Sequence, residues 1–558
     1  MNRIGKSIIV GLAMLAMATL LAACGSSGTS ASTSTAAKGV VKLDVTDAPS
    51  LDYAHVYITV TGIGFHTSST TGFSDYSSGR RAGWQTVTLP APKTIDLAQL
   101  ANGTMYADLT GSSLFDGITL PVGRYQQLRI FLASTEDTLT DSASALGLTY
   151  NNEVQLNGDT AHYPLRVPSA NTSGIKVIPE SPVVVTEGST VSLALDFNLS
   201  DDVVEVSPNG TVEFMLKPRL GYFDMGSVGA IKGAVSFSNL STSRIEVKAE
   251  QVRTGARRMV RRTAAVDRTT GAFTLYPLPI FGNATTAVYD VVIRGRQVET
   301  AIVKGITVHK GTTPATGIDL GTIALQAGTD FTTQLSGSLH PTGSWMNFYQ
   351  NVGGDLYEIR NQHLDPYTGK FHSGVDLSSG YVEVATYVPG SSLTFTTYSS
   401  TRGQYSMVAN AFGNYTSGSP TMLNGRGRMS VSVTGNAPHS KDGSGSSSIT
   451  GVFDDALLGT GMGHGMGGMM GGRKAQASSG QLFVVQDGMI VDSTGTLTGD
   501  SSVATAMNAT NGSVSVGNLP SGMYSMYAIG WGNGVVEAGN AGSVNVGGGN
   551  ARATIKMK

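Results

Sequence analysis

Four methionines and one histidine stand among glycines near the C-terminal end of the chain: Met462, His464, Met466, Met469 and Met470. Thioethers are soft ligands that suit Cu(I), imidazole is a common additional ligand, and glycine lets a chain fold closely around an ion. Residues 456–474 therefore form a candidate copper site. The alternative is a loop whose methionines contact apolar surfaces, and composition alone leaves both interpretations open.

The only cysteine, Cys24, ends the run Leu-Ala-Ala-Cys. A short basic start and an apolar stretch from Ile8 to Leu21 precede it, in the order that is typical of a secretory signal. The run resembles the bacterial lipobox, which implies removal of residues 1–23 and acylation of Cys24. Gly25 rather than Asp follows, and by resemblance to Gram-negative lipoproteins this implies delivery to the outer membrane. The alternative is an ordinary signal peptide with a chance cysteine.

This anchor would decide how the chain is held at a membrane. An apolar stretch of about 14 residues is shorter than the about 20 that span a hydrocarbon core, and no later segment is as apolar. We therefore expect attachment through lipid, and the lipoprotein resemblance implies three acyl chains. Because Cys24 is the only thiol, disulfides, Cys-ligated zinc and thiol catalysis are excluded once it is modified.

Charge and composition limit the classes of partner. Charged residues make up 14% of the chain and the formal net charge is −2, so no general positive field exists to attract nucleic acid. The hydrophobic content of 40% is ample for folded cores. The expected partners are therefore the lipid bilayer, through acylated Cys24, and a glycan or an envelope protein.

Signals of catalysis are missing. The sequence has no Gly-x-Ser-x-Gly elbow, no His-Glu-x-x-His and no phosphate-binding glycine loop, and its nine histidines are scattered. The N-terminal acids, such as Asp44, Asp47 and Asp202, lack the alternating spacing of a calcium loop and are interpreted as turn or solvent residues. We predict a protein that is not an enzyme and has no cofactor unless the methionine loop binds copper.

Two other groups of residues could bind a ligand. The basic run Arg257-Arg258-Met259-Val260-Arg261-Arg262 either meets phosphates or keeps an edge strand from pairing with other chains. Aromatic residues are frequent between 345 and 387, and a row of outward rings could stack on sugars; alternatively, the rings point into the core.

The chain predicts strands almost throughout. Short runs rich in Val, Ile, Thr and Tyr alternate with a period of two and are separated by Gly, Asn, Asp and Pro; Val56–Val60 and Ser192–Phe197 are examples. Helical periodicity is confined to short pieces near residues 96–100 and 143–146. The predicted fold class is all-β, with tandem β-sandwich domains.

Several separated stretches resemble one bacterial family, domain of unknown function 4382 (DUF4382). They include Leu43–Pro49, Leu120–Tyr125, Leu165–Ser169 and Phe214–Pro218. The resemblance implies a β-sandwich-like domain on a lipoprotein, with no settled activity.

Three later units share a strand, a Pro-containing turn with Gly, a Tyr and a second strand. This order resembles the carboxypeptidase-regulatory-like, transthyretin-like sandwich of the carbohydrate-binding-like fold, well in the last unit and weakly in the middle one. The predicted organisation is a signal peptide (1–23), a Ser/Thr/Gly tether (24–38), the first domain (39–225), module two (228–326), the looser module three (327–437) and module four (438–558) with its loop at 456–474.

The sequence thus predicts an outer-membrane lipoprotein with a non-catalytic binding or scaffolding role in the cell envelope. The alternatives are a carbohydrate-binding or adhesion protein, and a copper-handling protein that acts through the loop at Met462–Met470.

Overall fold

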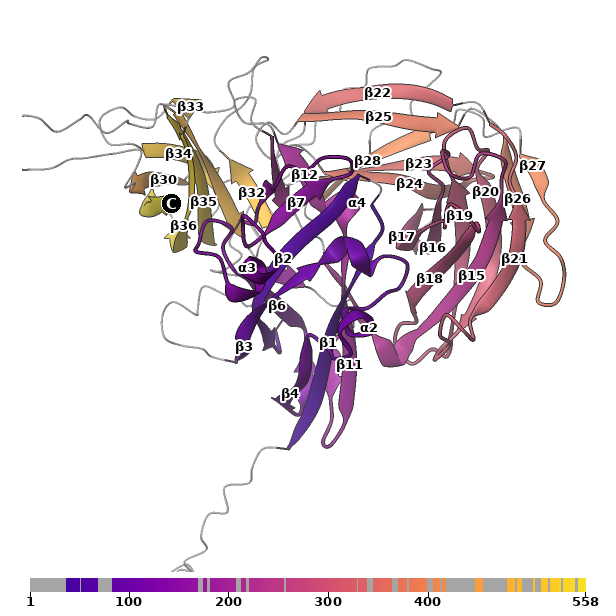
Figure 1. Ribbon diagram of the computed structural model, residues 1–558, viewed down its shortest axis with the longest axis horizontal. Helices are drawn as coiled ribbons and strands as arrows, with labels where there is room; N and C mark the ends of the chain where they lie inside the picture. The colour runs from indigo at the N-terminus through magenta and orange to yellow at the C-terminus, as the bar shows by residue number, and fades with distance from the viewer. Residues whose placement is uncertain are drawn as a thin grey trace, which may run out of the picture.

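The computed structural model describes most of the chain from residue 37 onward (Figure 1). The described residues are 37–50, 52–68, 83–168, 174–177, 181–206, 212–216, 220–254, 257–328, 330–338, 345–363, 370–378, 381–398, 405–411, 414–417, 447–454, 479–486, 489–493, 505–506, 513–519, 522–532, 535–546 and 550–557. The predicted all-β class is confirmed, because strands dominate and the helices among these residues have at most five residues.

The first domain contains three sheets around one apolar core. A four-stranded sheet has the order β14-β11-β1-β4, β10 pairs with β5, and an eight-stranded sheet has the order β12-β13-β8-β7-β2-β6-β9 with β3 added to β2. The strands are β1 (Lys38–Ala48), β2 (Tyr53–His66), β3 (Gln85–Asp96), β4 (Phe115–Pro121), β5 (Gly123–Tyr125), β6 (Gln127–Leu132), β7 (Glu153–Leu156), β8 (Tyr163–Arg166), β9 (Ile175–Val177), β10 (Val183–Val185), β11 (Thr190–Asn198), β12 (Val203–Val206), β13 (Glu213–Leu216) and β14 (Gly221–Asp224).

Alternating apolar residues build this core. In β1, Val41, Leu43 and Val45 are fully buried while the residues between them are less so, as a period of two requires. β1 pairs in parallel with β11, which lies about 150 residues later in the chain, so the core depends on a long-range contact.

Short helices lie where the sequence predicted them. The 3₁₀-helix η3 (Leu97–Leu100) begins after Asp96, whose side chain accepts a hydrogen bond from the Ala98 amide, and α3 (Asp141–Ala145) is capped in the same way by Thr140. The others in this domain are α2 (Tyr106–Thr110), α4 (Leu199–Asp202) and the 3₁₀-helix η5 (Met225–Ser227). Within the described residues, no helix has the length and apolar character needed to cross a bilayer.

Modules two and three share a ten-stranded sheet with the order β27-β26-β20-β19-β16-β17-β24-β23-β28-β29. The three-stranded sheet β18-β15-β21 faces its module-two part across an apolar core, and β22 pairs with β25. The strands are β15 (Val228–Ser236), β16 (Glu246–Thr254), β17 (Arg257–Ala265), β18 (Ala272–Pro279), β19 (Thr286–Arg294), β20 (Ala301–His309), β21 (Ile318–Ala324), β22 (Asp330–Ser338), β23 (Trp345–Val352), β24 (Asp355–His363), β25 (Lys370–Ser378), β26 (Val382–Thr386), β27 (Thr396–Tyr398), β28 (Tyr405–Ala411) and β29 (Asn414–Ser417).

The tyrosine after the Pro-containing turn of module two has a structural role. Tyr289 is fully buried, and its hydroxyl donates a hydrogen bond of 2.5 Å to the carbonyl of Pro279. The ring lies in the core rather than at the edge of the sandwich, because β19 pairs on both sides, with β16 and β20.

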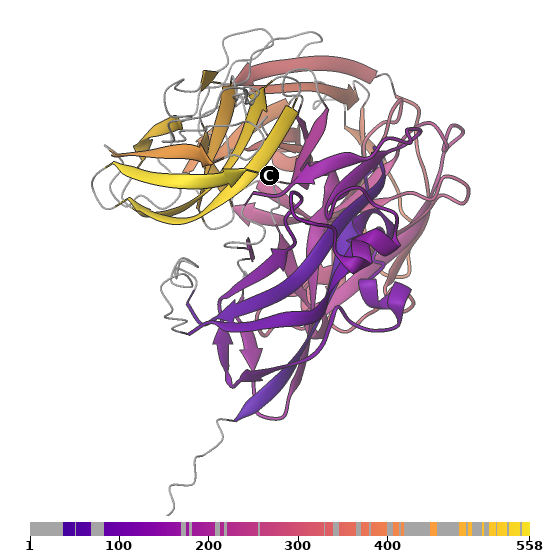
Figure 2. The ribbon, with the colours of Figure 1, turned by 60° about the vertical axis from the view of Figure 1, so that its left-hand side comes forward.

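Module four forms one eight-stranded sheet, with the order β32-β31-β35-β36-β37-β30-β34 and β33 added to β31. Its strands are β30 (Ser447–Asp454), β31 (Ser479–Gln486), β32 (Met489–Ser493), β33 (Thr505–Ala506), β34 (Ser513–Leu519), β35 (Gly522–Gly532), β36 (Val535–Val546) and β37 (Ala551–Met557). Its yellow strands lie beside the first domain in both views (Figures 1 and 2).

Candidate functional site

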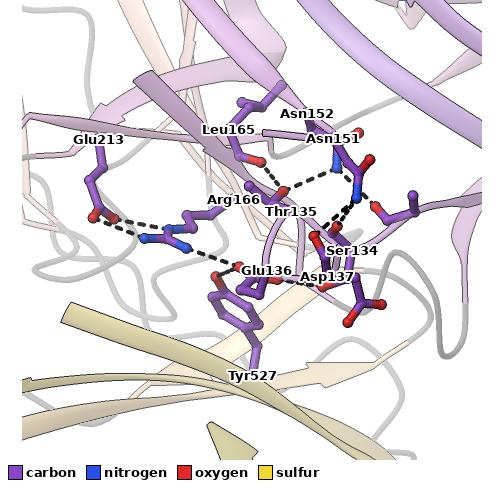
Figure 3. A network of polar contacts seen from close by, with 11 residues as sticks. Ser134, Thr135, Glu136, Asp137, Asn151, Asn152, Leu165, Arg166, Glu213 and Tyr527 are labelled. Atoms are coloured by element: carbon purple, nitrogen blue, oxygen red, sulfur yellow. Dashed lines mark hydrogen bonds and ion pairs between the residues drawn. The ribbon is translucent and has the colours of Figure 1, made fainter. Parts of the chain in front are cut away.

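An extensive polar network lies where the first domain meets module four (Figure 3). Arg166, at the end of β8, donates through Nε and Nη2 to the carboxylate of Glu213 on β13, at 3.1 Å each, and through Nη1 to Oε1 of Glu136 at 3.2 Å. The hydroxyl of Tyr527, on β35 of module four, donates to the same Glu136 oxygen at 2.7 Å. A fork of two bonds to one carboxylate is a strong, directional pairing.

Hydrogen bonds within the first domain hold the loop that carries Glu136. Asn151 donates through its amide nitrogen to the carbonyls of Ser134, Asp137 and Thr138, and Asn152 donates to Ala133 and to Thr135. Ser134 also donates to the second Glu136 oxygen at 2.5 Å. These bonds fix the carboxylate from its own domain, so Tyr527 meets an oxygen that is already in position.

Burial makes this junction energetically important. The Tyr527 side chain is fully buried, and the Glu136 and Glu213 side chains are 5% and 4% exposed. Burial alone would lower the pKa of Arg166, but the neighbouring Tyr527, Glu213 and Glu136 raise that pKa above its ordinary value. The guanidinium is therefore charged, and both carboxylates serve as its partners.

A second junction joins the first domain to module two. Arg262 on β17 has a fully buried side chain; it donates to Asp196 of β11, to the Thr46 hydroxyl at 2.9 Å and to the Asp47 carbonyl at 2.7 Å. All three acceptors belong to the first domain, so one arginine contacts two of its strands.

The carboxylates at this second junction are strongly affected by burial. Burial, and then the charge of Asp196, raise the pKa of Asp47 well above its ordinary value, although the Leu199 amide donates to its Oδ1. Burial likewise raises the pKa of Asp196 to about 6, against the opposing charge of Arg262. Asp47 Oδ2 and Arg262 Nε have no hydrogen-bond partner among the described residues.

A third junction joins modules two and three. Arg258 donates to Asp290 at 2.6 Å, pairs with Asp355 at 2.8 Å and lies 4.5 Å from the centre of the Tyr357 ring. The Tyr357 hydroxyl donates to Asp290 at 2.9 Å, and Lys304 pairs with Asp355 at 2.8 Å. An apolar cluster of Val292, Ile302, Val352, Tyr357 and Val382 completes this contact.

Both predicted roles of the basic run are wrong for Arg258 and Arg262. Arg258 and Arg262 are 8% and 2% exposed and form the two junctions just described, so they neither face an external phosphate nor protect an edge. The strand β17 is internal to its sheet, since it pairs with β16 and β24. The acids Asp47 and Asp202, interpreted as turn or solvent residues, are also buried, because the junction with module two and the end of β11 enclose them.

Most rings of module three that the structure describes point inward. Phe348, Tyr349 and Tyr357 are at most 4% exposed and pack within the sheets, which removes them from a sugar-binding row. Tyr381, just before β26, is 42% exposed, and Tyr398, the last residue of β27, is 39% exposed. The strands β26 and β27 pair with each other.

The remaining predicted site residues lie outside the described residues. They are Cys24 and the loop residues Met462, His464, Met466, Met469 and Met470. Their lipidation and copper binding stay predictions. In the part of the chain that the structure describes, no three His, Cys, Asp or Glu side chains gather closely enough to hold a metal ion by themselves.

The sequence did not predict that these residues join neighbouring domains. Arg166 and Tyr527 were noted only within family-like stretches and Arg262 only within a basic run, while Glu136 and Glu213 carried no local signal. Their contacts join residues 30 to 391 positions apart. Charged residues inside otherwise apolar strand runs were the one available sign.

The first domain also has a family match. Residues 38–218 match the family model "Domain of unknown function (DUF4382)". The first domain is therefore similar to this family, and the region is called the DUF4382 domain for that similarity. This match confirms the resemblance in the sequence, and it covers the strands from β1 to β13, including Glu136, Arg166 and Glu213 of the junction with module four. No curated protein matches the chain.

Solved structures give only distant similarities. The Bacillus anthracis TIE protein is 11% identical, with 92% of this chain and 73% of that chain covered and a TM-score of 0.13. BcpA, the major pilin subunit of Bacillus cereus, is 8% identical, covers 59% and 99%, and has a TM-score of 0.12. The pilus adhesin SpaC from Lactobacillus rhamnosus GG is 9% identical, covers 90% and 57%, and has a TM-score of 0.13. TM-scores this low support no inference about the fold or function of this chain.

Proposed function

We propose that this chain is a lipoprotein of the outer membrane, anchored through acylated Cys24, with a non-catalytic binding or scaffolding role in the cell envelope. The proposal rests first on the run Leu-Ala-Ala-Cys at the end of a leader-like apolar stretch. The residues 25–37 that follow would separate the anchor from β1, which begins at Lys38.

One observation favours a scaffolding role over catalysis. The buried charged residues between the domains pair with one another: Arg166 with Glu213 and Glu136, Arg262 with Asp196, and Arg258 with Asp290 and Asp355. Catalytic sites need charged groups that face a substrate, whereas these groups hold neighbouring domains together. Such junctions would give the anchored chain a defined shape on which envelope partners could assemble.

The anchor is tested by mass spectrometry of the protein purified from bacterial membranes. We expect an N-terminal peptide that begins at Cys24 and carries fatty acyl groups, and we expect the protein in the outer-membrane fraction. The Cys24→Ala variant should lose both the lipid and the membrane fraction. A wild-type N-terminus at any other residue, or an unmodified Cys24, would overturn the anchor.

The scaffolding role is tested by crosslinking in intact cells, followed by recovery of the acylated protein. Partners that crosslink to the wild-type protein but not to the double variant Tyr527→Ala/Arg262→Ala would depend on the arrangement of the domains. If the same partners were recovered with the wild-type protein and with the variant, the junctions would have no role in binding them. The result on acylation does not depend on this experiment.

Adhesion to a carbohydrate is the second candidate, favoured by the two exposed rings at Tyr381 and Tyr398. An exposed aromatic face is suited to stacking on a sugar ring. A glycan array probed with the folded protein should then give signals that Tyr381→Ala and Tyr398→Ala each abolish. The exposed Val388→Ala variant is the matched control, and an array without any signal would exclude this candidate.

A further inference from the structure

The chain enters the DUF4382 domain at one tip of that domain. The carbonyl of Ala37, the first described residue, accepts from the Val122 amide at 2.9 Å, and the carbonyl of Lys38 accepts from the Gly188 amide at 2.9 Å. In both views β1 begins at the lower end of the molecule, and modules two, three and four lie above this end (Figures 1 and 2). We call this tip, formed by the start of β1, the link between β4 and β5 and the turn between β10 and β11, the entry tip.

Backbone contacts hold the entry tip in a defined shape. The Val40 amide donates to the Ser189 carbonyl at 2.8 Å, and within the turn the Ser189 amide donates to the Thr186 carbonyl at 3.2 Å. A Cβ at Gly39 would lie 2.5 Å from the Thr186 carbonyl oxygen, so β1 starts in direct contact with this turn. The chain that leads back toward Cys24 therefore starts from a fixed point of the domain.

Val122 and Val184 are exposed at the entry tip. Val122 is 47% exposed, and on β10 Val184 is 43% exposed while its neighbours Val183 and Val185 are 3% and 1% exposed, as the alternation of a strand requires. Val185 lies opposite Gly123, the residue after Val122, so the two exposed valines stand on neighbouring segments of the tip. Single exposed valines are ordinary on a protein surface, but these two lie where the chain from the anchor arrives.

Cations accompany the two valines. Arg124 on β5 lies opposite Val184 on β10, and both Arg124 and Lys38 are exposed. Glu187, in the turn between β10 and β11, is an exposed acid beside them. Arginine and lysine pair with lipid phosphates while their aliphatic stems lie along apolar groups. The entry tip thus offers apolar side chains next to positive charge, a combination that suits the interface of a membrane.

The length of the chain between Cys24 and the entry tip keeps this surface near the bilayer. A chain from residue 25 to residue 37 spans at most about 45 Å when fully extended, and about 20 Å on average as a random coil. These residues are Gly, Ser, Thr and Ala, a composition that favours the coil. Tethering at this distance raises the effective concentration of lipid at the tip, so a contact too weak to hold the free protein forms readily in the anchored one.

We propose that the entry tip, through Val122, Val184, Lys38 and Arg124, contacts the phospholipid bilayer in which Cys24 is anchored. This contact rests on the acylation proposed for Cys24. The valines enter the interfacial region of the bilayer, and the two cations pair with lipid phosphates. The contact orients the DUF4382 domain with its tip on the membrane and holds modules two, three and four away from it.

The experiment places a fluorescent label on the acylated, full-length protein in vesicles of phosphatidylethanolamine and phosphatidylglycerol. Because acylation uses the thiol of Cys24, a Val184→Cys variant carries a single free thiol for the label. We expect nitroxide groups on the lipid headgroups to quench this label severalfold more strongly than a label at Val288→Cys. Val288 is the matched control, because it is 58% exposed and stands on β19 of module two, far from the entry tip (Figure 1).

Charge at the tip provides a second measurement. Arg124→Ser and, separately, a high salt concentration should reduce the quenching of the Val184→Cys label, because both weaken the pairing with phosphate. Arg268→Ser is the control: Arg268 is exposed in the loop between β17 and β18 of module two, and its loss should leave the quenching unchanged. A loss of quenching in Arg268→Ser as large as that in Arg124→Ser would overturn a local contact at the tip.

Mass spectrometry of the same protein separates the contact from the anchor. An unmodified Cys24 overturns the anchor and, with it, the contact. Equal quenching of the two labels on a chain whose Cys24 is acylated overturns the contact alone. The contact is also overturned if a photoreactive group at Val184 crosslinks to a protein in place of lipid in intact cells, since an envelope protein would then occupy the tip.

Discussion

At the scale of single residues, the hydroxyl of Tyr527 is the direct bond between module four and the DUF4382 domain. It donates at 2.7 Å to Glu136, whose carboxylate is already held by Arg166 and Ser134. Tyr527→Phe should weaken this junction by about 1.5–3 kcal/mol, because it removes a buried hydrogen bond to a charged acceptor. Denaturant unfolding of Tyr527→Phe, Glu136→Gln and the double variant measures the coupling; losses that simply add would contradict it.

A second residue-scale prediction concerns pH. The pKa of Asp196 is raised from 3.8 to about 6, so the folded protein holds more protons than the unfolded chain between these values. The contribution of Asp196 to stability should therefore fall as pH rises from about 4 to about 6, by at most about 3 kcal/mol, and then level off. The raised pKa of Asp47 acts in the same direction.

Unfolding midpoints of wild type and Asp196→Asn between pH 4 and pH 7 measure this effect. The variant should lose part of the dependence on pH, because its side chain does not titrate. If the unfolding midpoints of the two proteins changed with pH in parallel, the dependence on pH would not come from Asp196.

At the scale of elements, the turn between β17 and β18 requires glycine. Gly271 has φ of +75°, and a Cβ there would lie 2.0 Å from the Val235 carbonyl oxygen. The turn is closed by Asp267, which accepts from the amides of Thr269 and Thr270 through its side chain and from that of Gly271 through its carbonyl. Backbone conformation and contact thus both exclude a side chain at this position.

Gly282 is a matched control, with φ of +66° and no atom within 4 Å of the position that a Cβ would take. Gly282→Ala should cost only about 1–2 kcal/mol, which is the penalty of a left-handed conformation. Gly271→Ala should cost clearly more, because the strand β15 must also shift. Thermal unfolding of both variants checks the order, and equal losses would contradict the steric argument.

At the scale of the whole molecule, the DUF4382 domain lies between module two and module four, with a charged junction on each side (Figure 1). Arg262→Ala should destabilise the chain by about 3–5 kcal/mol, because it leaves Asp196 without its buried partner. It should also increase the radius of gyration in small-angle X-ray scattering as module two separates. The neighbouring Arg261→Ala is the control: Arg261 contacts Gln251 and Phe281 within module two, and its loss should leave the radius unchanged.

Sequence alone determined the local features of this protein. Alternating apolar residues predicted the strands, short stretches of helical periodicity predicted the two short helices, and spaced motifs indicated the DUF4382 domain, because each of these signals is carried by residues close together in the chain. Only the tertiary structure decided what the charged residues do. Arg262 in a basic run and Glu136 in a polar loop look solvent-facing by composition, yet both are buried against partners 66 and 391 residues away. A charged side chain is buried at low cost only where partners compensate its desolvation, and local sequence does not encode a meeting with a distant partner.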